Sequence, residues 1–199
     1  MAVNFSESKT KENLMRAFAG ESQARSRYTI AAERAEKEGM YTIADIFRYT
    51  ADQERAHAER YYDLLKALAG ETIHIDGSYP VDQQDSLPGL LRAAEHNEHE
   101  EYEDVYQAFG DTATEEGFHE AASAFYQIAE VEHVHEERFG RLAKLLEDGT
   151  YYGGGEVTKW MCTNCGYIHE GNQAPKYCPA CRHEQGYFIP YEFACYRGE

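Results

Sequence analysis

Glutamates lie on the apolar faces of the long helices that this sequence predicts. Four runs rich in Ala, Glu, Leu, Arg and Lys each end at a glycine, the usual left-handed residue after a helix. They predict helices over residues 10–38, 41–69, 88–109 and 115–148. Because an unpaired buried carboxylate is costly, a glutamate on such a face must be protonated, paired or bound to metal. The glutamates at these apolar positions are Glu21, Glu54, Glu95 and Glu98.

Helices of this length joined by short turns predict an antiparallel four-helix bundle. The connection over residues 70–85 is longer and polar, so we expect it to cross over along the bundle. Ser86 before Pro88 marks the start of the third helix. Thr112-x-x-Glu115 has the pattern of a capping box and predicts the start of the fourth.

A Glu-x-x-His pair occurs in the second predicted helix and again in the fourth. The two copies are Glu54–His57 and Glu130–His133. Residues three apart share a helix face, so each copy would turn one carboxylate and one imidazole inward. One copy arises easily by chance in a Glu-rich helix, but two copies indicate a duplicated helix hairpin. Two such pairs, with inward glutamates from the other two helices, are the donor set of di-iron carboxylate bundles.

The first and third predicted helices carry the matching glutamates. Glu21 precedes Tyr28 by seven residues, and Glu95 precedes Tyr102 by seven. Both tyrosines are either core aromatics or hydrogen-bond donors to ligand carboxylates. Acidic residues near the proposed ligands and the other histidines of the helical region are expected at the surface: Glu100, Glu101, Glu103, Asp104, Glu132, Glu136, Glu137, His74, His96, His99, His119 and His135.

The C-terminal residues predict a small metal-binding module. Four thiolates make a tetrahedral site for zinc or iron, and the spacing alone leaves both metals open. About 40 residues bury too little surface to fold unaided, so a metal would stabilise them. The predicted organisation is a helical domain over residues 1–149, a linker over 150–158 and the module over 159–199. Two C-x-x-C pairs supply the thiolates, Cys162/Cys165 and Cys178/Cys181, and Cys195 is left over as a bystander.

Charge and hydropathy exclude several classes of protein. The net charge of −17 disfavours binding to nucleic acid, which needs a basic surface. No apolar run approaches the roughly 20 residues of a membrane span, and the polar start has no signal-peptide core, so we expect a cytoplasmic protein. The glycines at 153–155 lack the strand–turn–helix context of a dinucleotide motif. We therefore expect no direct binding of NADH.

With both donor sets in this order, the whole chain resembles a rubrerythrin. The resemblance implies an all-α, ferritin-like four-helix bundle followed by a small rubredoxin-like β module. It implies an oxo-bridged di-iron centre in the bundle and one iron at the four cysteines, where zinc is the alternative. The matching residues are Glu21, Glu54-x-x-His57, Glu95-x-x-Glu98, Glu130-x-x-His133, Cys162-x-x-Cys165-Gly-Tyr and Cys178-Pro-x-Cys181.

The resemblance also implies an activity and partners. The reaction would be reduction of hydrogen peroxide in defence against oxidative stress. Electrons would come from an NAD(P)H-dependent reductase or a rubredoxin and pass through the cysteine-bound iron. The family also implies a head-to-tail homodimer or a higher homo-oligomer.

The resemblance assigns roles to individual residues. Glu54 and Glu130 would bridge the two irons. Glu98 and His57 would exchange as ligands of one iron when its oxidation state changes. The outer ligand pairs would be Glu21 with His57 and Glu95 with His133. The residues expected to take part in catalysis are Glu98, His57, Tyr28 and Tyr102.

Two other classes of function stay open. A ferroxidase that oxidises and handles Fe²⁺ would use the same bundle ligands but would leave the cysteine module without a purpose. A binding protein with a zinc ribbon as adaptor would explain the cysteines but not the duplicated Glu/His set.

Overall fold

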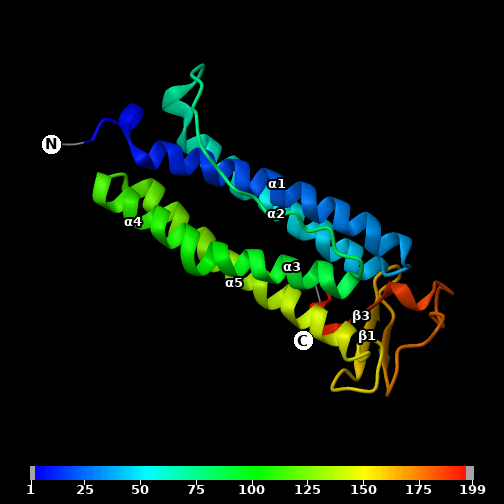
Figure 1. Ribbon diagram of the computed structural model, residues 1–199. Helices are drawn as coiled ribbons and strands as arrows, with labels where there is room; N and C mark the ends of the chain where they lie inside the picture. The colour runs from blue at the N-terminus through cyan, green and yellow to red at the C-terminus, as the bar shows by residue number, and fades with distance from the viewer. Residues whose placement is uncertain (1–2, 196–199) are drawn as a thin grey trace.

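Long helices that run side by side make up most of the protein (Figure 1). The structure, a computed structural model, describes residues 3–195. The helices are α1 (Lys9–Lys37), α2 (Tyr41–Leu64), α3 (Leu87–Glu100), α4 (Tyr106–Glu116) and α5 (His119–Glu147). In the bundle, α1 lies against α2, and α5 lies against α3 and α4, which confirms the predicted all-α bundle. The short elements are the 3₁₀ turns η1 (Phe5–Glu7) and η2 (Lys66–Leu68) and the π-helical turn η3 (Glu101–Val105).

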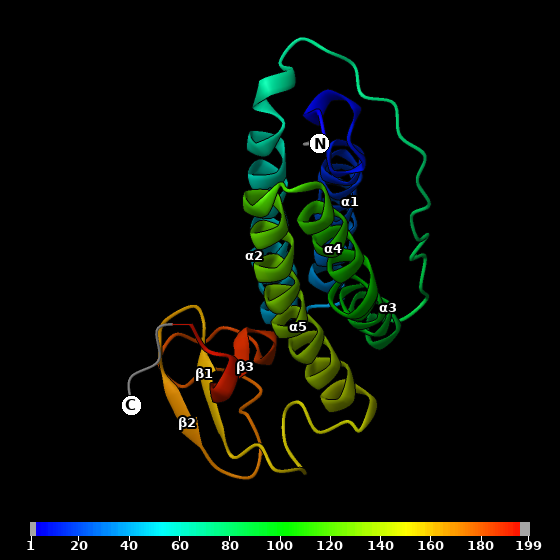
Figure 2. The same ribbon diagram turned by 90° about the vertical axis from the view of Figure 1, so that its left-hand side faces the viewer.

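The connection between α2 and α3 crosses over along the bundle, as predicted. Residues 71–84 form no regular secondary structure. They run down the outside of the bundle from one end to the other (Figure 2). Ser86 caps α3 as expected, because its Oγ accepts a hydrogen bond from the Gly89 N–H at 3.2 Å. We call residues 70–85 the crossover segment.

The elements α3, η3 and α4 follow one another without a break, and we call them together the third rod. This rod ends later than the sequence predicted. Gly110 lies inside α4, where a Cβ atom would come within 2.4 Å of the Tyr126 ring, so glycine is needed there for close packing and not for a turn. The rod ends at Gly117, which has the left-handed φ of 87°. The predicted capping box at Thr112 is therefore wrong, and the Thr112 hydroxyl instead donates to the Ala108 carbonyl at 2.9 Å.

The π-helical turn η3 changes which residues of the third rod face inward. A π turn accommodates one more residue than an α turn. The rod consequently buries Glu98 and Tyr106, eight residues apart, whereas α1 buries Glu21 and Tyr28, seven apart. The seven-residue repeat predicted for Glu95 in this rod is therefore wrong, because the sequence pattern does not reveal the extra residue.

A small antiparallel sheet follows the bundle and packs against its end. Tyr151, Trp160 and Phe188 share one apolar core with Ile43 and Phe47 of α2. The stretch predicted as a linker thus contributes a buried aromatic ring, while the division at residues 149 and 158 stays a prediction. The strand order is β2-β1-β3, and the elements are β1 (Lys159–Cys162), β2 (Ile168–Glu170), β3 (Phe188–Pro190), η4 (Gln185–Tyr187) and η5 (Tyr191–Phe193).

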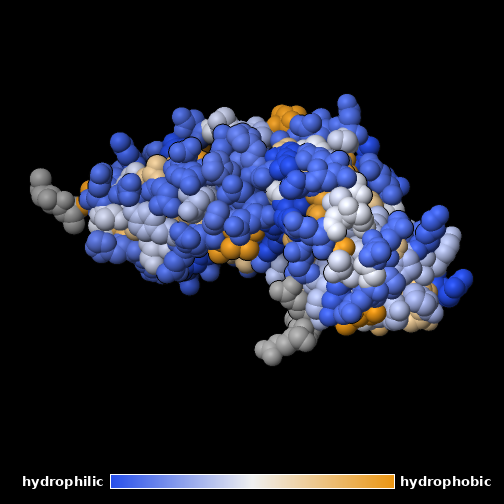
Figure 3. Space-filling model, turned by 90° about the horizontal axis from the view of Figure 1, so that it is seen from below, coloured by the Kyte–Doolittle hydropathy of each residue, from blue (hydrophilic) through white to orange (hydrophobic). Residues whose placement is uncertain are grey.

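The outer surface agrees with the acidic composition. Hydrophilic residues predominate on the face shown in Figure 3, with only scattered apolar residues. Within residues 3–195, no helix combines the length and the apolar character needed to cross a bilayer.

Candidate metal centres

Carboxylates and imidazoles gather in the middle of the bundle core. The side chain of His57 is 12% exposed, and the others of this set are 1% exposed or less. Their ligand atoms form two overlapping groups, each with all atoms within 4.8 Å of one another. The first group is Glu21, Glu54, His57 and Glu132, and the second is Glu54, Glu98, Glu132 and His135. We call these six residues the carboxylate cluster.

Two glutamates of the cluster are shared between its halves. His57 Nδ1 lies 3.1 Å from a Glu54 oxygen and 3.0 Å from a Glu132 oxygen. His135 Nδ1 lies 3.1 Å from the other oxygen of Glu54 and 2.8 Å from the other oxygen of Glu132. The two halves are therefore related by a pseudo-twofold axis, as a duplicated helix hairpin predicts.

The outer glutamates of the cluster are each held by a tyrosine from the other half. Tyr28 of α1 donates a hydrogen bond to Glu98 of α3. Tyr106 of α4 donates to Glu21 of α1 at 2.5 Å. Tyr28 is thus a donor to the cluster, one of the two roles considered for it. Tyr102 is not, since its half-buried ring stacks on His133 outside the cluster, so Tyr106 occupies the place predicted for Tyr102.

The structure does not bring the predicted pair in α5, Glu130 and His133, into the carboxylate cluster; the pair two residues later lies there instead. Glu130 is exposed, and the His133 side chain is 40% exposed and lies 3.0 Å from a Glu136 oxygen. Glu132 and His135, which were expected at the surface, are both fully buried. The segment contains two overlapping Glu-x-x-His pairs, and only the helix face that each occupies distinguishes them.

The apolar stripe of α5 is the signal that identifies the correct pair. Phe125, Ile128, Glu132, His135 and Phe139 recur at helical spacing on its buried face. The stripe assumed for Glu130 also carries the charged Glu137, which contradicts a core-facing position. In the structure, Glu54 and Glu132 also both lie 13 residues after the first residue of their helix (54 − 41 and 132 − 119).

Glu95 does not reach the carboxylate cluster. It is half-buried one turn before Glu98 and pairs with Arg92 at 2.7 Å. The glutamate of α3 that belongs to the cluster is Glu98. A further glutamate of the third rod, Glu101, follows three residues later. Glu101 was expected at the surface but is partly buried beside Gly20 of α1. Burial and the nearby carboxylates, Glu21 first among them, raise the pKa of Glu101 well above its usual range.

The cluster brings four carboxylates and two imidazoles together in one buried site. Burial raises the pKa of Glu54, but contacts with His135 and His57 outweigh it and lower that pKa to about 2. Burial and then the Glu54 charge raise the pKa of Glu98 to about 8, and burial and then Glu132 raise the pKa of Glu21 well above its usual range. Bound cations would offset the repulsion between these buried carboxylates, which is one cause of their raised pKa values.

The donor atoms fit a pair of metal ions. Buried polar atoms normally have hydrogen-bond partners, and those that lack one require an explanation such as a bound ion. Carboxylate oxygen and imidazole nitrogen are donors that suit iron. Among the described residues, six buried cluster atoms have no partner of hydrogen-bond geometry: Glu21 Oε2, Glu54 Oε1, Glu98 Oε2, both carboxylate oxygens of Glu132, and His135 Nδ1.

The two histidines differ in how their second ring nitrogen is held. His135 Nε2 lies 3.1 Å from the side-chain oxygen of Gln53. Arg138 donates to the same Gln53 oxygen at 3.2 Å and to the Thr50 hydroxyl at 3.0 Å. Metal-bound histidines usually donate their other N–H in this way, which fixes the ring. Within residues 3–195, the structure gives no such partner for Nε2 of His57.

Four cysteines converge in the C-terminal module. Their sulfur atoms lie within 4.8 Å of one another, with Cys162 and Cys181 at 3.7 Å and Cys165 and Cys178 at 3.7 Å. Gly166 has φ +77° and donates its N–H to the Cys162 carbonyl at 2.8 Å, the tight turn that the first pair needs. This arrangement matches the predicted four-thiolate site, and Cys195 lies outside it.

Comparisons with known proteins match both parts of the chain. A family model described as Rubrerythrin matches residues 12–143, and one described as the rubredoxin-like domain of rubrerythrin matches residues 160–189. A rubrerythrin of Clostridium perfringens is 50% identical over 182 residues, which cover 90% of this chain and 93% of that protein. A rubrerythrin of Porphyromonas gingivalis is 49% identical over 183 residues, which cover 92% and 90%.

Solved structures give the same assignment of fold. A structure of nigerythrin in a mixed-valence state is 31% identical, covers 96% of this chain and 94% of its own, and has a TM-score of 0.61. A bacterioferritin of Desulfovibrio desulfuricans is 24% identical, covers 70% and 81%, and has a TM-score of 0.64. The bacterioferritin shows likeness of fold alone, and it confirms that the bundle is ferritin-like.

Proposed function

Because the chain belongs to the rubrerythrin family, as its resemblance predicted, we propose that it is a non-haem di-iron peroxidase. Rubrerythrins bind a di-iron centre and one iron held by four cysteines, and this chain has both ligand sets. The reaction is H₂O₂ + 2 e⁻ + 2 H⁺ → 2 H₂O. The observation that carries the proposal is the buried, pseudo-symmetric carboxylate cluster in one chain with a four-thiolate site.

The geometry supports a specific ligand assignment in the bundle. Glu54 and Glu132 would bridge the two metals, because each turns one oxygen toward His57 and the other toward His135. The outer positions would pair Glu21 with His57 and Glu98 with His135, which lie 3.7 Å and 3.6 Å apart. When bound, the two irons supply the electrons that cleave the O–O bond.

Glu101 is the better candidate for the exchangeable carboxylate that the sequence assigned to Glu98. Glu98 is held by Tyr28 and lies beside His135, so it has little freedom to leave its place. Within the described residues, no hydrogen bond or ion pair restrains the Glu101 carboxylate. An oxidised iron favours an anionic ligand and a reduced iron accepts imidazole, so Glu101 would exchange with His57.

The two buried tyrosines keep the outer glutamates in place. Burial raises the pKa of Tyr28 and of Tyr106 well above the usual range, so both hydroxyls stay protonated and continue to donate. Each hydroxyl occupies one oxygen of its glutamate, which leaves the other oxygen for a metal ion. Tyr28 and Tyr106 thus act as positioning residues for Glu98 and Glu21.

Electrons would reach the bundle through the cysteine-bound iron. The proposed donors are an NAD(P)H-dependent reductase or a rubredoxin, and the proposed assembly is a head-to-tail homodimer or a higher homo-oligomer in the cytoplasm. Mixed dimers test the route between subunits, with Cys162→Ser in one subunit and Glu54→Gln in the other. Restored activity in the mixture supports electron transfer across the dimer, and inactivity removes that support.

Rapid mixing of reduced, iron-loaded protein with hydrogen peroxide tests the function directly. We expect one peroxide to be consumed for every two electrons, without release of dioxygen. Dioxygen release would indicate disproportionation instead. Slow reaction with peroxide together with rapid oxidation of added Fe²⁺ to a mineral would favour the ferroxidase alternative.

A further inference from the structure

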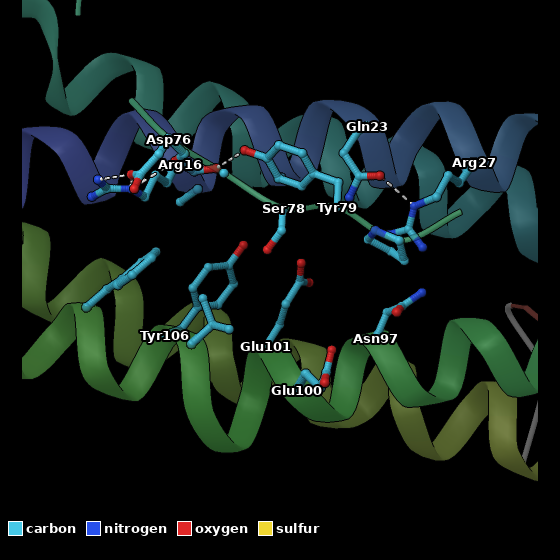
Figure 4. A pocket seen from close by; sticks show the side chains of 16 residues that line it. Arg16, Gln23, Arg27, Asp76, Ser78, Tyr79, Asn97, Glu100, Glu101 and Tyr106 are labelled. Atoms are coloured by element: carbon cyan, nitrogen blue, oxygen red, sulfur yellow. Dashed lines mark hydrogen bonds and ion pairs between the residues drawn. The ribbon is translucent and has the colours of Figure 1, made fainter. Parts of the chain in front are cut away.

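A pocket of about 570 Å³ opens beside the carboxylate cluster (Figure 4). Residues of α1 form one side of it, and the third rod forms the other. Asp76 to Pro80 of the crossover segment pass over its mouth. We call it the crossover pocket. The pocket opens at the molecular surface, while the metal donors lie in the core. Whether a molecule in the pocket can approach the metals therefore depends on what lies at its inner end.

The inner end of the crossover pocket borders the cluster directly. Tyr106 lines the pocket and also donates its hydroxyl to Glu21, a cluster residue. Glu101 lines it as well, and its carboxylate points toward Ser78 of the crossover segment in Figure 4. Glu101 and Tyr106 therefore lie between this pocket and the carboxylate cluster.

Gly20 leaves space open between Glu101 and the Tyr79 ring. It immediately precedes Glu21 and lines the pocket. A Cβ atom at Gly20 would lie 3.9 Å from a Glu101 oxygen and 3.9 Å from the Tyr79 ring. A methyl group would therefore fit at ordinary contact distance, whereas a longer side chain would fill the space between Glu101 and Tyr79.

The mouth of the pocket is polar and held at a fixed width. Arg16 pairs with Asp76 at 2.6 Å, and Tyr79 donates to the Arg16 carbonyl at 3.4 Å, so the crossover segment is tied to α1. Further along, Asn97 donates to Asp82 at 2.8 Å. Both signs of charge line the mouth, which suits a small polar molecule better than an apolar one.

Aromatic packing covers other sides of the cluster. Tyr28 packs against Phe47 and Phe139, with ring centroids 6.0 Å and 5.2 Å away. Tyr61 packs against Phe125 at 5.1 Å. The partly exposed edge of His57 is the competing approach to the cluster.

We propose that the crossover pocket is the route by which hydrogen peroxide reaches the cluster, and that Gly20 keeps it open. The inference rests on the proposed function for the identity of the oxidant. The route itself concerns any small molecule that reaches the metals, so it can be tested with a probe that is not turned over.

The test measures how fast azide reaches iron in the loaded protein, from the change in iron absorption after mixing. Gly20→Leu should lower the azide association rate by about tenfold, the equivalent of about 1.4 kcal/mol of barrier. Gly20→Ala should lower it less. Ser26→Leu is the matched control, because it adds the same side chain to an exposed position of α1 and should leave the rate unchanged. Iron content and thermal unfolding are measured for every variant.

A second variant keeps the test decisive if Gly20→Leu fails to fold. Tyr79→Ala removes an exposed ring from the mouth, so the rate with a bulky organic hydroperoxide should rise relative to hydrogen peroxide. A wild-type azide rate in fully loaded Gly20→Leu would overturn the proposal and point to the His57 edge. If the wild-type protein does not reduce peroxide but azide is still slowed, only the proposed function fails.

Discussion

Gln53→Leu removes the acceptor that holds His135, and the structure predicts which metal site responds. In the native protein, His135 Nε2 lies 3.1 Å from the Gln53 oxygen, which Arg138 also contacts at 3.2 Å. Leucine is close in size but accepts no hydrogen bond. The substitution therefore leaves a ring N–H and part of a guanidinium without a partner, while every residue of the carboxylate cluster stays in place.

The expected magnitude follows from the burial of the ring. His135 is 0% exposed, so water cannot replace the lost acceptor. A buried donor left unpaired costs about 1–3 kcal/mol. Loss of an outer partner of a metal-bound histidine typically weakens metal binding about 10- to 100-fold, which is about 1.4–2.8 kcal/mol. The first figure is a cost to stability and the second a loss of metal affinity, and both concern the site with His135 and not the one with His57.

Anaerobic titration of the metal-free protein with Co²⁺ or Fe²⁺, against a competing chelator, measures the effect. Gln53→Leu should weaken one of the two bundle sites and leave the other near the native affinity. Gln53→Glu keeps an acceptor at the same position and should restore binding. Gln127→Leu serves as the control, because Gln127 is exposed and donates a hydrogen bond to Ser123, away from the cluster. Equal weakening of both sites, or of neither, would refute the argument that the hydrogen bond to Gln53 supports His135 and not His57.

Two further predictions concern the fold. Glu116→Gln should cost about 1 kcal/mol, because its carboxylate accepts from the Thr10 N–H at 2.8 Å and the Thr10 hydroxyl at 2.6 Å, as an N-terminal cap does. Burial raises the pKa of Glu116, but hydrogen bonds from Thr10 outweigh it, so the pKa is lowered in the folded protein. The stabilisation is therefore present above the pKa of the unfolded chain and is lost as the pH falls through the pKa of the folded protein. Urea unfolding at neutral and acidic pH measures this loss, and the exposed Glu115→Gln should lack it. Gly110→Ala should lower the unfolding temperature at a cost of about 1–3 kcal/mol, because its methyl group would collide with Tyr126; an unchanged temperature would contradict the close packing.

Periodicity in the sequence predicts the helices, the crossover segment and four of the six cluster residues, Glu21, Glu54, His57 and Glu98. Glu21, Glu54 and His57 lie on α1 and α2, which are regular helices with one clear apolar stripe each. The cysteine ligands are equally clear, because C-x-x-C spacing constrains the backbone locally. These features depend on contacts within one or two helical turns.

The errors come from features that the spacing of residues does not encode. The π turn η3 adds a residue in the third rod, so the glutamates and tyrosine that face the cluster cannot be extrapolated from α1. In α5, two overlapping Glu-x-x-His pairs satisfy the same spacing, and the apolar stripe through Phe125 and Phe139 decides between them. Gly110 resembles a helix stop but is a packing glycine, which only the neighbouring helix reveals.

The ligand assignment in α5 is the central claim, and the iron content of two matched variants tests it most directly. Glu132→Gln removes a shared carboxylate of the cluster, whereas Glu130→Gln changes an exposed residue two positions away. We expect Glu130→Gln to keep the native iron content and Glu132→Gln to lose iron from the bundle while the thiolate-bound iron remains. Loss of bundle iron in Glu130→Gln, with full loading of Glu132→Gln, would contradict the account.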